Sequence, residues 1–121
     1  MTKTIDFIFD FGSPNGYLSW KVLPGVAQRT GATINLIPCL LGGIFKALGT
    51  VSLVKQPGMA AYSEKDFARS ARFLGVPYAH PAEFPVNTIA ASRAYYWLHG
   101  QDCALARRFA HEVFRAYFAA G

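Results

Sequence analysis

Hydrophobic and polar positions divide the chain into a short part with strand-type runs and a longer part with helical spacing. Residues 4–11, Thr-Ile-Asp-Phe-Ile-Phe-Asp-Phe, form an apolar run typical of a strand buried on most of its surface. Residues 33–38 alternate and end at a proline, which predicts a second strand. Between them, Leu18, Val22 and Val26 recur every four residues and predict the buried stripe of a helix. This order is long enough for a parallel strand–helix–strand crossover.

Both ends of this first helix carry recognisable signals. Ser13 is a preferred N-cap residue, and Pro14 is tolerated at the first helical position because its missing N–H would be unpaired there anyway. Gly31 is a plausible C-terminal stop. Pro24 lies inside the pattern and predicts a kink or an early break.

After the second strand the pattern becomes mainly helical. Residues 40–49 predict a loop and a short helix bounded by glycines, and residues 51–58 an irregular connection. Residues 59–74 are helical in content and spacing and are closed by Gly75. Residues 76–81 contain two prolines and are expected to be extended.

Two further helices follow. Asn87 or Thr88 would cap a helix over residues 89–98 that stops at Gly100. Asp102 can cap the last helix. The apolar stripe of that last helix includes Ala106, Phe109, Ala110, Val113, Phe114 and Tyr117.

Composition and length indicate a single α/β domain over residues 1–121. Residues 1–38 form the strand–helix–strand half, and residues 39–121 form a mainly helical region. The chain is 52% hydrophobic and only 16% charged, which is too apolar for intrinsic disorder. Such an excess of apolar residues either fills a large core or covers a surface that awaits a partner.

Charge and hydropathy argue against several classes of protein. The net charge of +5 comes from scattered basic residues without a nucleic-acid-binding signature, so no nucleic-acid partner is expected. No run approaches the ~20 apolar residues of a membrane span, so no membrane partner is expected. The N-terminus lacks the apolar segment of a signal peptide, which predicts a cytoplasmic protein.

Cysteine and histidine positions suggest no metal site. Cys39 and Cys103 form no C-x-x-C motif and are interpreted as two buried thiols, although a disulfide between them stays open. His80, His99 and His111 have no metal-ligand spacing and are expected to be structural or exposed.

The junction between the first strand and the first helix is the most informative point for chemistry. A side chain at a helix N-terminus faces unpaired backbone N–H groups and the positive end of the helix dipole, which stabilise an anion. Ser13 stands there, and its hydroxyl can donate a hydrogen bond to a bound thiolate. The alternative is that Ser13 is only a helix cap.

Three ordered motifs resemble those of 2-hydroxychromene-2-carboxylate isomerases, which belong with kappa-class glutathione transferases in the DsbA-like branch of the thioredoxin superfamily. Residues 9–14 read Phe-Asp-Phe-Gly-Ser-Pro, residues 40–46 Leu-Leu-Gly-Gly-Ile-Phe-Lys, and residues 84–88 Phe-Pro-Val-Asn-Thr, with Arg93 beyond them. The resemblance runs along essentially the whole chain. It implies a thioredoxin-like unit with a DsbA-like helical insertion.

The resemblance also implies an activity. It makes glutathione the cofactor of a cis-trans isomerase acting on a small molecule from aromatic degradation. Ser13 replaces the redox cysteine of related oxidoreductases and hydrogen-bonds the glutathione sulfur, which makes it the catalytic residue. A kappa-like glutathione S-transferase is the alternative enzyme. A dithiol oxidoreductase is not expected, because no second cysteine could resolve a mixed disulfide.

The resemblance implies further site residues, at positions that match those of the family. Asn15 and Pro38, with Ser13, are expected to bind the cofactor, although Asn15 departs from the aromatic residue often found there. Lys46, Thr50 and Asn87 are expected to bind substrate. Lys46 could instead be a solvated lysine, Thr50 stands where relatives commonly have asparagine, and Asn87 could be only a helix cap.

Relatives continue with a β-hairpin and a final helix, so the chain is expected to be truncated before them. A second interpretation is therefore a non-catalytic fragment that self-associates, and a homodimer is expected. The strand carrying Phe7, Phe9 and Phe11, and the faces of the last helices, should then lie uncovered.

Overall fold

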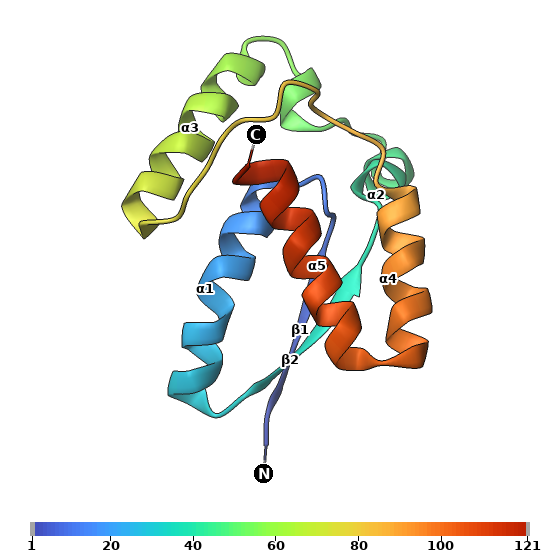
Figure 1. The fold of residues 1–121 in the computed structure, drawn as a ribbon. Helices are drawn as coiled ribbons and strands as arrows, with labels where there is room; N and C mark the ends of the chain where they lie inside the picture. Colours follow the sequence, from blue (N-terminus) through green and yellow to red (C-terminus); the bar gives the residue numbers. More distant parts are fainter. Residues whose placement is uncertain (1, 121) are drawn as a thin grey trace.

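The sheet of this protein consists of two parallel strands joined by a helix. In the computed structural model, which describes residues 2–120, β1 (Thr4–Phe9) and β2 (Thr33–Pro38) are joined by α1 (Pro14–Thr30). The register runs from Thr4 opposite Thr33 to Phe9 opposite Pro38. Figure 1 shows the resulting βαβ unit and confirms the expected parallel crossover.

The helical region contains α2 (Leu41–Leu48), a 3₁₀ turn η1 (Leu53–Lys55), α3 (Met59–Leu74), α4 (Ile89–Gln101) and α5 (Cys103–Phe118). These bounds confirm the predicted helices, with α4 continuing through Gly100. Gly49 and Gly75 end α2 and α3 in left-handed conformations, with φ of 70° and 68°. Residues 75–88 form no helix or strand.

An early break of α1 at Pro24, one of the two outcomes expected there, does not occur, and β1 is shorter than expected. The helix does not break at Pro24 but continues to Thr30, because one missing N–H is tolerated within 17 residues. It ends instead where Gly31 becomes left-handed and donates its N–H to the Ala27 carbonyl. β1 stops at Phe9, two residues earlier than expected, where the chain turns toward α1.

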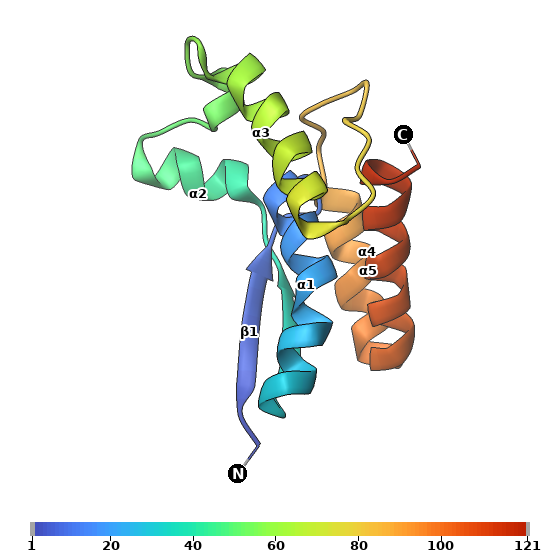
Figure 2. The same cartoon turned by 90° about the vertical axis from the view of Figure 1, so that its left-hand side faces the viewer.

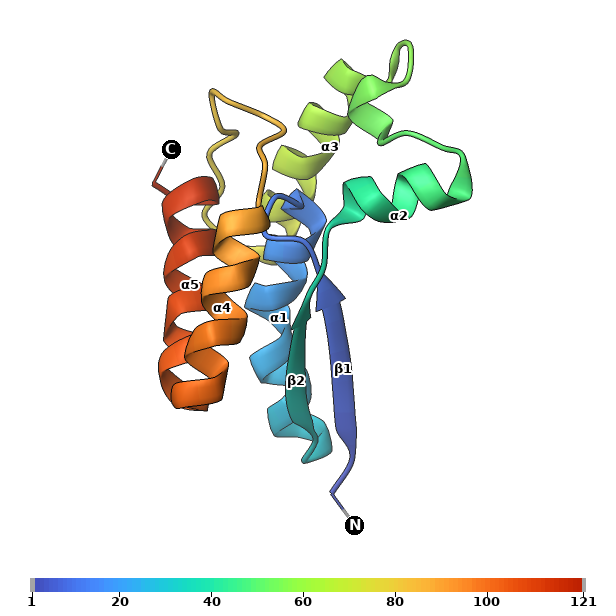
Figure 3. The same ribbon diagram turned by 90° about the vertical axis from the view of Figure 1, so that its right-hand side faces the viewer.

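The helices α1, α4 and α5 lie on one side of the sheet, and α2 and α3 lie beyond the carboxyl ends of the strands (Figures 2 and 3). No helix among residues 2–120 lies over the other face of the sheet. Ile8, which points to that face, is therefore 62% exposed, whereas Phe9 is buried. The expectation of a strand buried on most of its surface is wrong for β1, because the sheet is covered on one side.

The expected exposure of Phe7, Phe9 and Phe11 is also wrong. Phe9 and Phe11 are buried, and Phe7 is partly buried against the same core. Their side chains point toward the helices because residues two apart share one face of a strand. In the α5 stripe, Ala106, Ala110 and Phe114 are buried, and its other residues are partly buried, whereas Trp97 on α4 is 67% exposed.

Phe114 on α5 lies at the centre of an aromatic core. Its ring centroid is 5.4 Å from those of both Phe9 and Phe11, and 5.8 Å from that of Trp20. Tyr17 packs at 6.1 Å from the same ring. The predicted α1 stripe is correct only for Leu18: Val22 is exposed and Val26 half-buried, because the core lies at the N-terminal end of α1.

Tyrosine hydroxyls fasten the long connection between α3 and α4. Tyr17 on α1 donates to the Pro77 carbonyl, and Tyr117 on α5 donates to the Glu83 carbonyl at 2.7 Å. Burial raises the pKa of both phenols, so they remain donors in neutral solution. A segment without its own backbone ladder is thereby fixed to two helices.

The core arrangement predicts a large difference between two phenylalanines. Phe114→Ala, at a fully buried ring, should lower the free energy of unfolding by about 3–5 kcal/mol. Phe73→Ala is the matched control because Phe73 is 89% exposed, and its effect should stay within about 0.5 kcal/mol. Urea unfolding followed by circular dichroism measures both; equal effects would contradict this description of the core.

Candidate functional site

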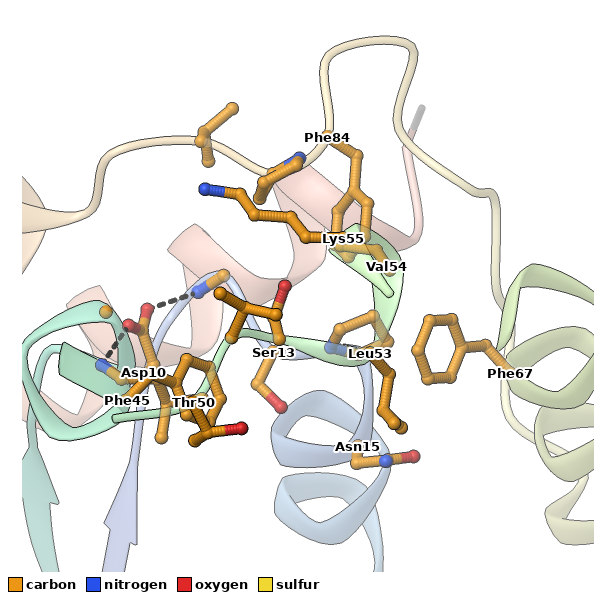
Figure 4. A pocket seen from close by; sticks show the side chains of 18 of the residues that line it. Asp10, Ser13, Asn15, Phe45, Thr50, Leu53, Val54, Lys55, Phe67 and Phe84 are labelled. Carbon is orange, nitrogen blue, oxygen red and sulfur yellow. Dashed lines mark hydrogen bonds between the residues drawn. The ribbon is translucent and has the colours of Figure 1, made fainter. Parts of the chain in front are cut away.

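A pocket of about 660 Å³ opens beyond the carboxyl ends of the strands, beside the start of α1. Figure 4 shows Ser13 among side chains from the β1–α1 turn, α2, η1, α3 and the connection before α4. Four of the residues predicted from sequence line this pocket: Ser13, Asn15, Lys46 and Thr50. The structure therefore brings together cofactor-site and substrate-site predictions that lie up to 37 positions apart.

Ser13 is both a helix cap and a pocket residue. Its Oγ accepts a hydrogen bond from the Gly16 N–H at 3.0 Å, which is the geometry of an N-cap. This bond uses a lone pair of the hydroxyl and leaves its O–H free to donate. The two interpretations offered by the sequence are thus compatible, because capping does not consume the hydrogen that a bound thiolate would need.

Close packing around the turn sets the position of Ser13. A Cβ on Gly12 would lie 3.3 Å from the Thr88 methyl, and one on Gly16 would lie 3.3 Å from the Ser13 Cβ. Pro14 is buried directly after the cap. The turn is therefore held between α1 and the segment that leads into α4, with little room for larger side chains.

Asp10 joins three segments at this site, and the sequence analysis did not identify it. One carboxylate oxygen accepts from the Gly12 N–H at 2.8 Å and from the Thr88 hydroxyl at 2.7 Å. The other oxygen accepts from the Leu41 N–H at 2.9 Å, at the first turn of α2. The available signal was an acidic residue at the end of an apolar strand, because a half-buried carboxylate must find donors.

The charge of the pocket is positive. Lys46 from α2 and Lys55 from η1 both line it, and α1 presents its N-terminal backbone with no acidic residue in the first turn. The acidic lining residue is Asp10, whose two oxygens are occupied by the bonds described above. This balance favours anionic ligands.

Much of the remaining wall is apolar. Phe45, Leu53, Phe67 and Phe84 contribute large side chains from four different segments (Figure 4). The Phe84 ring packs against the His80 ring in a tilted arrangement, with centroids 4.8 Å apart and an interplanar angle of 58°. The sequence analysis missed Leu53, Lys55 and Phe84 as wall residues because they lie in segments without a regular pattern. It missed Phe45 and Phe67 because helical spacing does not reveal which apolar side chains of α2 and α3 face a pocket.

Pro38 and Asn87 are not among the residues that line the pocket. The Pro38 carbonyl accepts a hydrogen bond from the Tyr96 hydroxyl at the end of β2. The Asn87 amide oxygen accepts from the Ile89 N–H at 2.9 Å, which supports its interpretation as a cap of α4. Thr88 occupies the N-cap position of α4, but its side chain makes no capping hydrogen bond, and its hydroxyl donates to Asp10.

The cysteines are both free, and one differs from expectation. Cys39 is half-buried, and burial together with the Asp10 carboxylate raises the pKa of its thiol. Cys103 is exposed rather than buried, because it begins α5 at the surface. Within residues 2–120, no group of three or more His, Cys, Asp or Glu side chains is arranged to hold a metal ion.

A parallel βαβ unit, an N-capped helix facing a pocket at the strand ends and an appended helical region define a thioredoxin-like α/β protein. Residues 4–121 match the family model described as "DSBA-like thioredoxin domain", and the chain belongs to this family. Both the fold class and the family resemblance predicted from the sequence are thereby confirmed.

Named relatives agree with this assignment. The chain is 31% identical over 115 residues to Glutathione S-transferase kappa 1 of Caenorhabditis elegans, covering 90% of this chain and 51% of the relative. It is 36% identical over 110 residues to 2-hydroxychromene-2-carboxylate isomerase of Sphingobium xenophagum, covering 86% and 53%. The chain thus spans about half the length of these curated relatives.

A solved structure of 2-hydroxychromene-2-carboxylate isomerase superposes with a TM-score of 0.80 at 30% identity. The match covers 98% of this chain and 57% of that one.

Among residues 2–120, no helix combines the length and the apolar character needed to cross a membrane. The homologues place the chain in an isomerase and transferase type of enzyme family.

The Asp10 contacts predict a strong effect of a small change. Asp10→Asn removes one acceptor and the charge that assists three hydrogen bonds, so the free energy of unfolding should fall by about 2–3 kcal/mol. Asp6→Asn is the matched control because Asp6 is exposed and accepts only from Asn35, and it should change little. Chemical unfolding at neutral pH measures both, and indistinguishable variants would refute the role of Asp10.

Proposed function

We propose that this pocket binds glutathione and serves a cis-trans isomerisation of the 2-hydroxychromene-2-carboxylate type. The observation that carries the proposal is Ser13, placed at the start of α1 with a free hydroxyl hydrogen inside a positively charged pocket. The similarity to isomerases of that name supports the same reaction class. The substrate would be an unsaturated small molecule that carries a carboxylate.

Ser13 would stabilise the sulfur of glutathione as a thiolate. Its Oγ accepts from the Gly16 N–H, so its hydroxyl hydrogen is free to donate to an anion in front of α1, where the helix dipole also favours negative charge. A hydrogen bond to a charged atom is stronger than one between neutral groups, so the deprotonated thiol gains more than the thiol. When bound, glutathione supplies a nucleophilic sulfur that adds to the substrate reversibly, which permits rotation about the former double bond.

The remaining pocket residues suit the other parts of the ligands. Asn15, exposed two residues after the cap, offers both an amide donor and an acceptor to the cofactor. Lys46 and Lys55 would attract carboxylates, and Thr50 adds a hydroxyl beside Lys46. The apolar wall would hold an aromatic ring away from water.

A kappa-like glutathione S-transferase is the second candidate, favoured by the similarity to the Caenorhabditis elegans relative. The two reactions use the same thiolate and differ in the fate of the sulfur. Isomerisation releases glutathione unchanged, whereas conjugation consumes it. Measuring free thiol before and after turnover therefore separates the candidates.

Glutathione binding tests the proposal directly. Calorimetry with millimolar glutathione should give a saturable heat for the 121-residue chain, and absence of any heat would end the proposal for this chain. Ser13→Ala should lower the isomerase or conjugation rate about a hundredfold, because the donor to the thiolate is lost. A variant that keeps the full rate would remove Ser13 from the mechanism.

Ser13→Ala also removes a helix cap, so a second variant is needed. Ser13→Asp keeps the side-chain acceptor for the Gly16 N–H and should retain the folded state. It places a negative charge beside the thiolate and should abolish glutathione binding. Folded but inactive Ser13→Asp, together with inactive Ser13→Ala, would separate the chemical role of the hydroxyl from its capping role.

The lysines predict a selective change in substrate affinity. Lys46→Gln and Lys55→Gln should each raise KM for a carboxylate-bearing substrate about threefold to tenfold, with a smaller effect for a neutral analogue. Lys65→Gln on α3 is the matched control, because Lys65 is exposed and does not belong to the pocket lining. Steady-state kinetics with both substrates checks this; equal effects on the neutral analogue would count against a charge interaction.

A further inference from the structure

A second, polar cavity of about 330 Å³ lies at the opposite end of the sheet from the glutathione pocket. Thr4 and Thr33, which begin β1 and β2, form part of its wall. Tyr95 and His99 from α4 and Cys103 from the start of α5 line the same cavity. None of these residues belongs to the pocket around Ser13.

Cys103 and His99 form a close pair in this cavity. The Cys103 Sγ is 3.6 Å from the His99 Nε2, within the range of a sulfur hydrogen bond. The His99 ring stacks on the Tyr95 ring, with centroids 5.8 Å apart and an interplanar angle of 29°. The imidazole is therefore held in position to accept the thiol proton, and the thiol itself is exposed to solvent.

Tyr95 gives an independent indication that the cavity accepts a ligand. Its side chain is almost completely buried, with only 3% exposed. The hydroxyls of Tyr17, Tyr78, Tyr96 and Tyr117 are all hydrogen-bonded, whereas that of Tyr95 has no partner within residues 2–120. The hydroxyl oxygen is not among the fully buried unpaired atoms of the described chain, so it faces the cavity and can bond to a polar group that enters it.

Arg107 determines the charge of the cavity. One terminal nitrogen of its guanidinium donates to the Ile34 carbonyl at 2.7 Å, which holds the group at the cavity wall. Its other N–H groups remain available for an anion. No acidic side chain is found among the described residues that line this cavity. A ligand with a carboxylate would therefore be favoured here.

We propose that Cys103 is a covalent thiol site that exchanges with small carboxylate-bearing disulfides. His99 accepts the thiol proton, and the Cys103 sulfur attacks one sulfur of the disulfide. A bond forms between Cys103 and that sulfur while the disulfide bond breaks. The departing thiolate takes the proton from His99. Cys103 is oxidised, and the released half of the disulfide is reduced to a thiol.

The captured half of the disulfide remains in the cavity as a mixed disulfide. Its carboxylate pairs with Arg107, and a polar group meets the Tyr95 hydroxyl. This site does not depend on Ser13 or on the reaction proposed above. Cys39 provides an internal comparison, because burial and the nearby Asp10 carboxylate raise the pKa of that thiol.

The test uses the full chain with glutathione disulfide as the probe. Intact-mass measurement with peptide mapping should show Cys103 glutathionylated at least about tenfold faster than Cys39. His99→Gln should slow the Cys103 reaction about tenfold. Modification of Cys39 at the same rate as Cys103, or an unchanged rate in His99→Gln, would overturn the proposal. Because His99 is exposed, His99→Gln should leave the fold intact, which circular dichroism checks.

A pair of alkylating reagents tests the role of Arg107. The ratio of the rates of Cys103 with anionic iodoacetate and neutral iodoacetamide should fall about threefold in Arg107→Gln. Arg107→Lys is the matched control, because it keeps the positive charge and should largely preserve the ratio. An unchanged ratio in Arg107→Gln would show that the cavity does not select anions and would overturn that part of the proposal.

Discussion

The Asp10 carboxylate is the interaction on which the pocket depends. It joins the turn after β1, the first turn of α2 and the beginning of α4 through three hydrogen bonds. The turn after β1, α2 and the connection that leads into α4 all contribute residues to the lining of the pocket. A half-buried charge satisfied by three donors is stable only if all three remain in place, so the segments are positioned together.

Ser13 illustrates how one local geometry can serve both stability and chemistry. The cap uses the oxygen lone pairs of the hydroxyl, and a bound thiolate would use its hydrogen. Helix formation thus brings the hydroxyl to a position where backbone dipoles already favour an anion. Substitutions at Ser13 therefore need the cap-preserving comparison, because loss of function and loss of helix stability originate from the same atom.

Local signals in the sequence predicted most of the fold, whereas contacts between distant residues were not predictable. Ser13 and Gly31 delimit α1 through caps that depend on a few neighbouring residues, and the helical spacing of α3 and α5 was equally local. Asp10 pairs with Thr88 across 78 positions, a contact that no periodicity encodes. Phe9 and Phe11 were expected to be uncovered because the second half of the fold was expected to be absent, but α1, α4 and α5 cover the face of the sheet on which they lie.

Three long-range hydrogen bonds, one of them at the pocket, have a consequence for the order of folding. The Asp10–Thr88, Tyr17–Pro77 and Tyr96–Pro38 contacts close loops of 78, 60 and 58 positions, respectively. Closing such loops has an entropic cost that local helix formation does not bear, so these contacts form late. The Asp10–Thr88 bond, which joins two segments beside the pocket, therefore forms after the helices on either side of it. Because the pocket needs this bond, we expect ligand binding to appear only when folding is complete.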